Sequence, residues 1–137
     1  MTLLIDTNIL LDVLMDRQQH RMHSSLVWKL CETGLVDGYI CALSFADIVY
    51  IMRKTLDPKK TNVLIESLSL IFCFEDLKGA DLIKAAALQW DDYEDALQAI
   101  AAERIHADYI VTRNTTDYRN SPVPAITPTD LLQQFSV

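Results

Sequence analysis

Residues 2–14 read TLLIDTNILLDVL, and the change of pattern inside this stretch decides the fold. Leu3, Leu4 and Ile5 form a continuous apolar run, which is typical of a strand covered on both faces. From Thr7 on, the apolar residues recur at helical spacing. Asp6 stands at the junction, where a carboxylate is costly unless something uses its charge. The stretch therefore predicts a buried strand, then a helix, with an acid between them that needs a role.

The same alternation of strand and helix continues along the chain. Strand-like runs are expected at 38–42, 70–74, 109–112 and 125–127, and helical patterns fill the intervals. Strands that alternate with helices indicate a parallel sheet with helices on both faces. We therefore expect a single domain over residues 1–137, a three-layer α/β/α fold around a central parallel sheet of four to five strands.

Composition supports an ordinary globular domain. The chain has 137 residues, of which half are hydrophobic, and only 3 glycines and 4 prolines. A chain of this length buries a core without disulfides or metal staples, and the three cysteines lack C-x-x-C spacing, so they are expected to be reduced core residues. No apolar run approaches the ~20 residues of a membrane span, and the N-terminus lacks the pattern of a signal peptide. These features predict a cytoplasmic protein.

Four aspartates are expected at one edge of the sheet, the edge where ligands of parallel sheets bind. Asp6 ends the first strand, Asp47 follows the second, Asp95 begins the helix before the fourth, and Asp117 follows the fourth. The net charge of −7 argues against a generic nucleic-acid coat protein but allows an enzyme that meets phosphate through a bound cation. Clustered carboxylates raise one another's pKa unless a cation neutralises them. The pattern therefore predicts a site for Mg²⁺ or Mn²⁺, ions that prefer oxygen ligands.

Each acid also has a purely structural explanation. Ser44 and Asp47 have the S-x-x-D spacing of a capping box, and Asp92 and Asp95 repeat it as D-x-x-D. Asp6 fits the N-cap of the following helix, and the fourth acid fits a turn. Capping is the better explanation of any one acid, but it predicts no shared edge, so the metal interpretation is preferred for the set. Asp92 stays open between cap and acidic rim.

Four segments together resemble the PIN-domain ribonucleases, especially the toxins of VapBC-type toxin–antitoxin pairs. The segments are LLIDTNILLDVL (3–14), LSFADIVYIMRK (43–54), DYEDALQAIAAERIHADYIVTRNTTDY (92–118) and VPAITPTDLL (123–132). The third is the most specific, because D-A-L-Q, an alanine-rich helix, I-V-T-R-N and D-Y occur in the order and at the spacing of the family.

The resemblance implies a divalent-metal-dependent endoribonuclease that hydrolyses phosphodiester bonds in RNA, with a cognate antitoxin and a homodimer as partners. By analogy, the catalytic acids are Asp6, Asp47, Asp95 and Asp117, the metal ligands are Asp6, Asp95 and Asp117, and the supporting polar residues are Asn8, Thr112 and Asn114. For Thr112 and Asn114, strand-end and turn chemistry is an equal alternative. The family usually has glutamate at the position of Asp47. Aspartate keeps the charge, but its side chain is shorter than that of glutamate by one methylene.

A negatively charged protein needs local cations to bind RNA. Arg113 and Arg119 flank the expected site, and Arg53 and Lys54 form a second candidate patch for the RNA backbone.

Two other functions are compatible with parts of the sequence. A catalytically weak PIN-like module for binding or assembly is supported by Asp47. A response-regulator or phosphatase-like domain also places aspartate at strand ends, but it expects a lysine at a later strand end. Arg113 and Asn114 follow the fourth strand instead, and no lysine occurs after Lys84.

Overall fold

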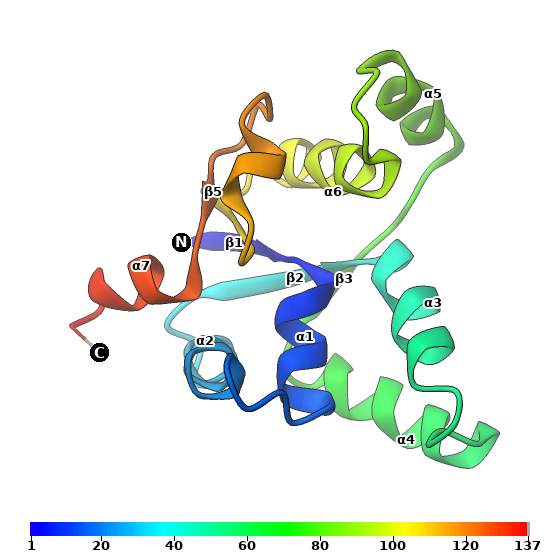
Figure 1. Ribbon diagram of the computed structural model, residues 1–137, viewed down its shortest axis with the longest axis vertical. Coiled ribbons are helices and arrows are strands. Elements are labelled where there is room, and N and C mark those ends of the chain that lie inside the picture. The colour runs from blue at the N-terminus through cyan, green and yellow to red at the C-terminus, as the bar shows by residue number, and fades with distance from the viewer. Residues whose placement is uncertain (137) are drawn as a thin grey trace.

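Five parallel strands form one sheet in the order β3-β2-β1-β4-β5 (Figure 1). The structure is a computed structural model that describes residues 1–136. The strands are β1 (Thr2–Ile5), β2 (Asp37–Cys41), β3 (Cys73–Glu75), β4 (Tyr109–Val111) and β5 (Ala125–Ile126). Every neighbouring pair is parallel, as continuous apolar runs predict. The carboxyl ends of all five strands therefore meet at one edge.

Helices cover both faces of the sheet. They are α1 (Thr7–Leu14), α2 (Arg21–Glu32), α3 (Ala42–Ile51), α4 (Pro58–Ser69), α5 (Gly79–Ala87), α6 (Tyr93–Arg104) and α7 (Pro128–Gln133), with a 3-10 turn, η1 (Thr115–Tyr118). Figure 1 shows α5 and α6 on one side of β1 and β2, and α1, α2 and α4 on the other. The predicted three-layer α/β/α fold with a parallel sheet is confirmed.

The central strand β1 contributes side chains to the hydrophobic core on both faces of the sheet, because successive side chains of a strand point to opposite faces. Leu3 and Ile5 pack in the core that α1, α2 and α7 cover. Leu4 packs on the other face, against Ala99 and Ala102 of α6. All three side chains of the β1 run are fully buried, so the register of this strand is fixed by both layers.

Some element boundaries differ from the predicted ones. The strand expected at 70–74 is β3 at Cys73–Glu75, because the first residues of that apolar run finish the preceding helix. Cys73 is exposed there, which corrects its assignment to the core, whereas Cys31 and Cys41 are buried as expected. Within residues 1–136, none of the helices combines the length and apolarity that crossing a membrane requires.

Gly38 lets β2 pass close to α2 and the segment before β3. A Cβ at this position would lie 2.5 Å from Cys31 Sγ and 3.0 Å from Phe72 Cδ1. Both neighbours are buried, so they have little room to move.

We predict that Gly38→Ala lowers the free energy of unfolding by about 2 kcal/mol through overpacking. Gly79→Ala is the matched control, since a Cβ at Gly79 meets nothing within 4 Å and alanine favours the helix that begins there. Urea unfolding of the two variants and the parent measures the difference. Equal stability of Gly38→Ala and the parent would contradict the close packing described.

Candidate functional site

The register between β1 and β4 determines where Asp6 lies. Ile5 pairs with Val111, so Asp6 and Thr112 leave the ends of these two strands side by side. The Asp6 amide donates to the Val111 carbonyl at 3.0 Å, and the Thr112 hydroxyl donates to Asp6 Oδ2 at 2.8 Å. Asp6 occupies the N-cap position of α1, but its side chain makes no capping hydrogen bond. Its carboxylate is thus held across the strand ends and faces the edge of the sheet.

A cavity of about 540 Å³ opens at this edge, and we call it the acidic cavity. Its acidic lining residues are Asp6, Asp47, Asp92, Glu94, Asp95 and Asp117, and its polar ones include Asn8, Gln98, Thr112, Arg113 and Asn114. The structure thus brings all four predicted acids and the three predicted polar residues to one cavity. Two further carboxylates, Asp92 and Glu94, join them.

Asp47 is not part of a capping box. Helix α3 begins at Ala42, so Ser44 lies inside its first turn and Asp47 lies near its middle. The Ser44 side chain is buried, shares a hydrogen bond of 2.8 Å with the Thr7 hydroxyl, and accepts one of 2.9 Å from Gln98 Nε2. The capping interpretation of Asp47 is therefore wrong, and its carboxylate lines the cavity without that role.

The capping prediction does hold for Asp92. Its carboxylate accepts from the Asp95 amide at 3.1 Å and caps α6, while the same residue lines the acidic cavity. Asp95 is held in turn by Tyr118, whose hydroxyl donates to Asp95 Oδ1 at 3.1 Å. Asp117 belongs to η1, which follows β4, and its side chain lines the same cavity.

Burial and mutual repulsion shift the acidity of these carboxylates. Burial, followed by the charges of Asp92, Asp6 and Asp117, raises the pKa of Asp95 to about 7, against the opposing hydrogen bond from Tyr118. Burial also raises the pKa of Asp6, against the Thr112 hydrogen bond. Burial and neighbouring Asp47 raise the pKa of Glu94. Without a counter-charge, the cavity therefore holds its carboxylates at an energetic cost.

One buried polar atom at the cavity has no partner. Gln98 is 2% exposed, and among residues 1–136 its Oε1 accepts no hydrogen bond, although its Nε2 is bound to Ser44. Buried polar atoms are nearly always satisfied, by protein, water or an ion. Sequence reasoning did not select Gln98, because only the fold places it beside Thr7 and Ser44.

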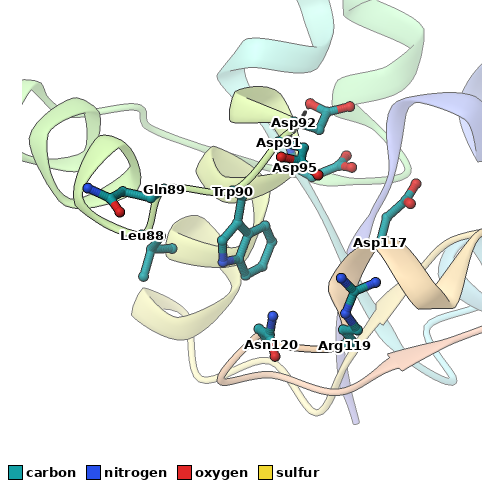
Figure 2. A pocket seen from close by; sticks show the side chains of 9 residues that line it. All are labelled: Leu88, Gln89, Trp90, Asp91, Asp92, Asp95, Asp117, Arg119 and Asn120. Atoms are coloured by element: carbon teal, nitrogen blue, oxygen red, sulfur yellow. Dashed lines mark hydrogen bonds between the residues drawn. The ribbon is translucent and has the colours of Figure 1, made fainter.

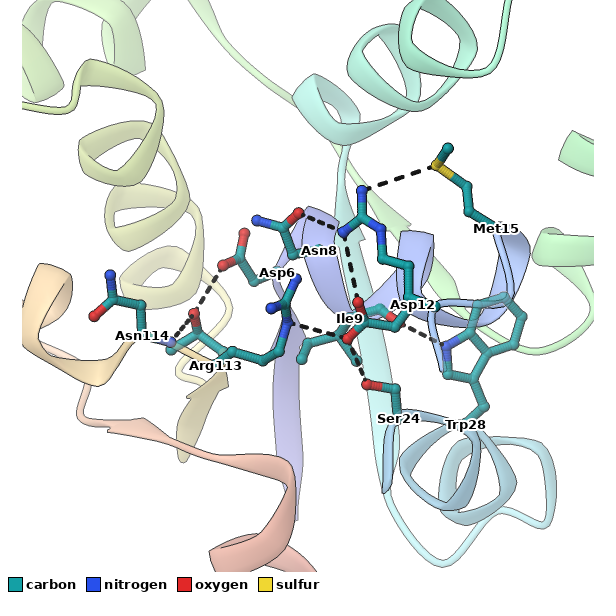
Figure 3. Close-up of polar contacts among 11 residues, drawn as sticks. Asp6, Asn8, Ile9, Asp12, Met15, Ser24, Trp28, Arg113 and Asn114 are labelled. Atoms are coloured by element: carbon teal, nitrogen blue, oxygen red, sulfur yellow. Dashed lines mark hydrogen bonds and ion pairs between the residues drawn. The ribbon is translucent and has the colours of Figure 1, made fainter. Parts of the chain in front are cut away.

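A second missed residue is Asp12, which is fully buried in α1. Asp12 accepts from Ser24 at 2.9 Å and forms ion pairs with Arg17 at 3.5 Å and Arg113 Nε at 3.2 Å. Figure 3 shows the Arg113 guanidinium between Asp6 and Asp12. Asp12 therefore fixes Arg113 at the wall of the acidic cavity. In the sequence, the only indication that Asp12 has a special role is that an aspartate lies within an otherwise apolar helix.

The other predicted cations do not line the acidic cavity. Arg119 lines a neighbouring cavity together with Asp95 and Asp117. Arg53 stacks on the Tyr50 ring at 4.2 Å and donates to the Tyr50 carbonyl, just past the end of α3. Lys54 is exposed, and neither it nor Arg53 lines the acidic cavity.

Comparison with known proteins decides the family. The sequence profile of the PIN domain matches residues 2–116. The chain belongs to the PIN-domain family. None of the curated proteins compared with it matches the chain.

Solved structures share the fold of this PIN domain over nearly its whole length. A toxin–antitoxin complex from Klebsiella pneumoniae contains a chain 20% identical, with a TM-score of 0.68, that covers 91% of this chain and 96% of its own. A chain of VapBC2 from Rickettsia felis, bound to a promoter DNA fragment, is 15% identical, with a TM-score of 0.69, and the match covers 93% of this chain and 98% of that one. A chain of FitAcB from Neisseria gonorrhoeae is 22% identical, with a TM-score of 0.63, and the match covers 93% of this chain and 98% of that one. At these identities the likeness establishes the fold.

The donor set of this PIN domain fits a hard divalent cation. The acidic cavity offers carboxylate, amide and hydroxyl oxygens, the ligands that Mg²⁺ and Mn²⁺ prefer. Within residues 1–136, no three histidine, cysteine, aspartate or glutamate side chains converge closely enough to hold one ion by themselves. Mg²⁺ usually keeps several waters and binds proteins through one or two carboxylates, so it does not require three converging side chains.

We predict that Asp6→Asn raises the stability of the metal-free PIN domain by roughly 1 kcal/mol, or about 4 °C in melting temperature. Asparagine keeps an acceptor for the Thr112 hydroxyl but removes one half-buried charge from the group of carboxylates. Thermal unfolding in EDTA measures the change, with Asp130→Asn, at the exposed start of α7, as the control. A large fall in melting temperature for Asp6→Asn would show that the charge is structural.

Proposed function

We propose that this PIN domain is a divalent-metal-dependent endoribonuclease and the toxin of a toxin–antitoxin pair. The observation that carries the proposal is the convergence of Asp6, Asp47, Asp95 and Asp117 on one cavity from four separate segments. Their burial and mutual repulsion raise the pKa of Asp95 and Asp6, a cost that a bound cation offsets. If these aspartates served only as helix caps and turn residues, they would not need to line the same cavity.

Asp6, Asp95 and Asp117 are proposed as metal ligands, with Asp47 as the fourth catalytic acid. A bound Mg²⁺ or Mn²⁺ supplies an activated water and offsets the charge that builds on the phosphate during hydrolysis. The chain orients the ligands: Thr112 fixes Asp6, and Tyr118 fixes Asp95. Asn8 and Asn114 complete the proposed polar support from the two sides of the cavity.

RNA must approach a chain with a net charge of −7. Arg113 is suited to receive its backbone, since the Asp12 contact uses its Nε and the guanidinium stands beside Asp6 (Figure 3). A fixed guanidinium loses little freedom on binding phosphate. Arg119 is a proposed contact from the neighbouring cavity, whereas Arg53 and Lys54 act only at longer range, if RNA extends past α3.

The solved relatives support the proposed partner. The similar chains from Klebsiella pneumoniae and Rickettsia felis belong to complexes described as toxin–antitoxin and VapBC2 assemblies. Since this chain covers more than nine-tenths of each, a cognate antitoxin is proposed for it as well. A homodimer is proposed from the resemblance to the family alone.

A catalytically weak binding module is the second candidate, and Asp47 favours it. Its carboxylate reaches one methylene less far than the glutamate that PIN ribonucleases usually carry there. The two candidates differ in whether the purified chain cleaves RNA.

We predict that the purified chain cleaves single-stranded RNA with Mg²⁺ or Mn²⁺ and that EDTA abolishes the cleavage, because the carboxylates require a cation to hold phosphate. A time course on a labelled RNA, followed by restoration with excess metal, measures this. The Asp6→Asn variant, purified alongside, controls for contaminating nuclease. Equal cleavage in EDTA would refute metal dependence.

We predict that Asp47→Asn folds normally and loses most cleavage, whereas Asp47→Glu keeps or exceeds the parent rate, particularly with Mg²⁺. Metal support needs negative charge and reach, and glutamate restores the family's length. Initial rates over a metal titration compare the variants. If Asp47→Asn cleaves RNA as fast as the parent, the site has only three essential acids.

A further inference from the structure

A second cavity, of about 490 Å³, adjoins the acidic one, and we call it the Trp90 cavity. Asp92, Asp95 and Asp117 line both cavities. The remaining lining comes from the turn between α5 and α6 and from Arg119 and Asn120 after η1. Because the cavities share these three residues, an RNA strand bound at the acidic cavity would pass beside the Trp90 cavity.

Trp90 supplies a flat aromatic surface in the cavity. Its ring is partly buried and meets Tyr118 edge-on, with 6.2 Å between ring centroids and 78° between planes. Figure 2 shows the indole in the middle of the cavity lining, between Leu88 and Gln89 on one side and Asn120 on the other. Among residues 1–136, the indole N–H donates no hydrogen bond, unlike that of Trp28, which donates to the Ile9 carbonyl. Trp90 is thus only partly packed in the core, and its indole N–H is available to a ligand.

Amide side chains stand around the aromatic ring. Gln89 has φ +55°, a left-handed conformation that non-glycine residues adopt at a cost, and it is held there at the end of α5. Both Gln89 and Asn120 are exposed and line the cavity. Each amide offers donors and an acceptor, which is the set that reads the edge of a planar heterocycle.

The charge of the lining favours an uncharged occupant over a phosphate that brings no cation. Four aspartates line the Trp90 cavity against one arginine, Arg119. An uncharged group meets no such repulsion, and carboxylates and amide oxygens accept hydrogen bonds from amino groups. Single-stranded RNA presents uncharged, planar bases that stack on aromatic side chains when they leave their own stack. The cavity thus has the aromatic face, the edge-reading groups and the charge that suit a base.

We propose that the Trp90 cavity binds the unstacked base of the nucleotide next to the scissile phosphate and prefers adenine, guanine and cytosine, which carry an amino group, over uracil. The proposal rests on the proposed cleavage of RNA at the acidic cavity. It makes Trp90 the stacking surface, with Gln89, Asn120, Asp91 and Asp92 as acceptors for the amino group. The ribonuclease then reads sequence at the position beside the cut.

Tryptophan fluorescence tests binding without cleavage. The chain has two tryptophans, so Trp28→Phe leaves Trp90 as the sole emitter. The probes are the 3′- and 5′-monophosphates of adenosine, cytidine and uridine in Mg²⁺, which contain no phosphodiester, with ribose 5-phosphate as the control that lacks a base. We expect quenching by the adenosine and cytidine nucleotides, weaker quenching by those of uridine, and none by ribose 5-phosphate. The Trp90→Phe variant, whose remaining Trp28 packs against Phe72, is expected to show no quenching. Absence of quenching in Trp28→Phe, or equal quenching by ribose 5-phosphate, overturns the proposal.

Cleavage kinetics test the same cavity with RNA. Trp90→Leu keeps an apolar side chain for packing but removes the stacking face, and it should raise KM about tenfold with little change in kcat, as the loss of one base–aromatic stack does. Trp90→Phe should recover part of this loss. One abasic nucleotide beside the cut should weaken the parent similarly and should leave Trp90→Leu unaffected. Parent cleavage that tolerates an abasic site at every position overturns the proposal, even if RNA cleavage itself is confirmed. If the parent cleaves no RNA, the proposed function fails, and the fluorescence titration still decides whether the cavity binds a base.

Discussion

The parallel pairing of β1 with β4 is the constraint on which the candidate site depends. Leu4 pairs with Ile110 and Ile5 with Val111, so Asp6 and Thr112 emerge together and form their hydrogen bond of 2.8 Å. A slip of one residue would turn Leu3, Leu4 and Ile5 to the wrong layers, and all three are fully buried. The hydrophobic core therefore sets the position of the first carboxylate, which has no capping hydrogen bond to keep it there.

From that position, the parallel topology gathers further negative charge. Helices α3 and α6 and the turn η1 all present carboxylates at the carboxyl edge of the sheet, as open parallel sheets present their ligand sites. Such crowding opposes folding when the groups are charged, and in the proposed function a bound cation offsets this cost. Buried Asp12 completes the arrangement, because it holds Arg113 beside these acids and so sets a cation at the wall of an anionic cavity.

Patterns local in sequence predicted most of the fold. The apolar run of β1 and the alternation with helices indicated the parallel sheet, and the D-x-x-D spacing predicted the Asp92 cap that the structure contains. The same reasoning failed at Ser44, because α3 begins two residues earlier and buries the hydroxyl against Thr7 and Gln98. It also misplaced β3, an edge strand of three residues whose apolar run is shared with the end of α4.

Sequence alone could not reveal contacts between distant positions. Asp12 and Arg113 are about a hundred residues apart, and nothing near either one signals the other. Gln98 and Trp90 look like ordinary members of helical segments until the fold places them at the two cavities. The four acids were selected because the alternation of strands and helices predicts that all four lie near the carboxyl edge of the sheet, and this topology supplies the long-range information. The metal assignment then rests on their chemistry.

Anomalous scattering from a crystal of this chain soaked in Mn²⁺ locates the ion and its ligands without reference to any activity. We expect a manganese peak in the acidic cavity, with oxygen ligands drawn from Asp6, Asp95 and Asp117 and the remaining positions filled by water. A cavity without manganese at saturating concentration, or an ion bound only elsewhere on the surface, would contradict it.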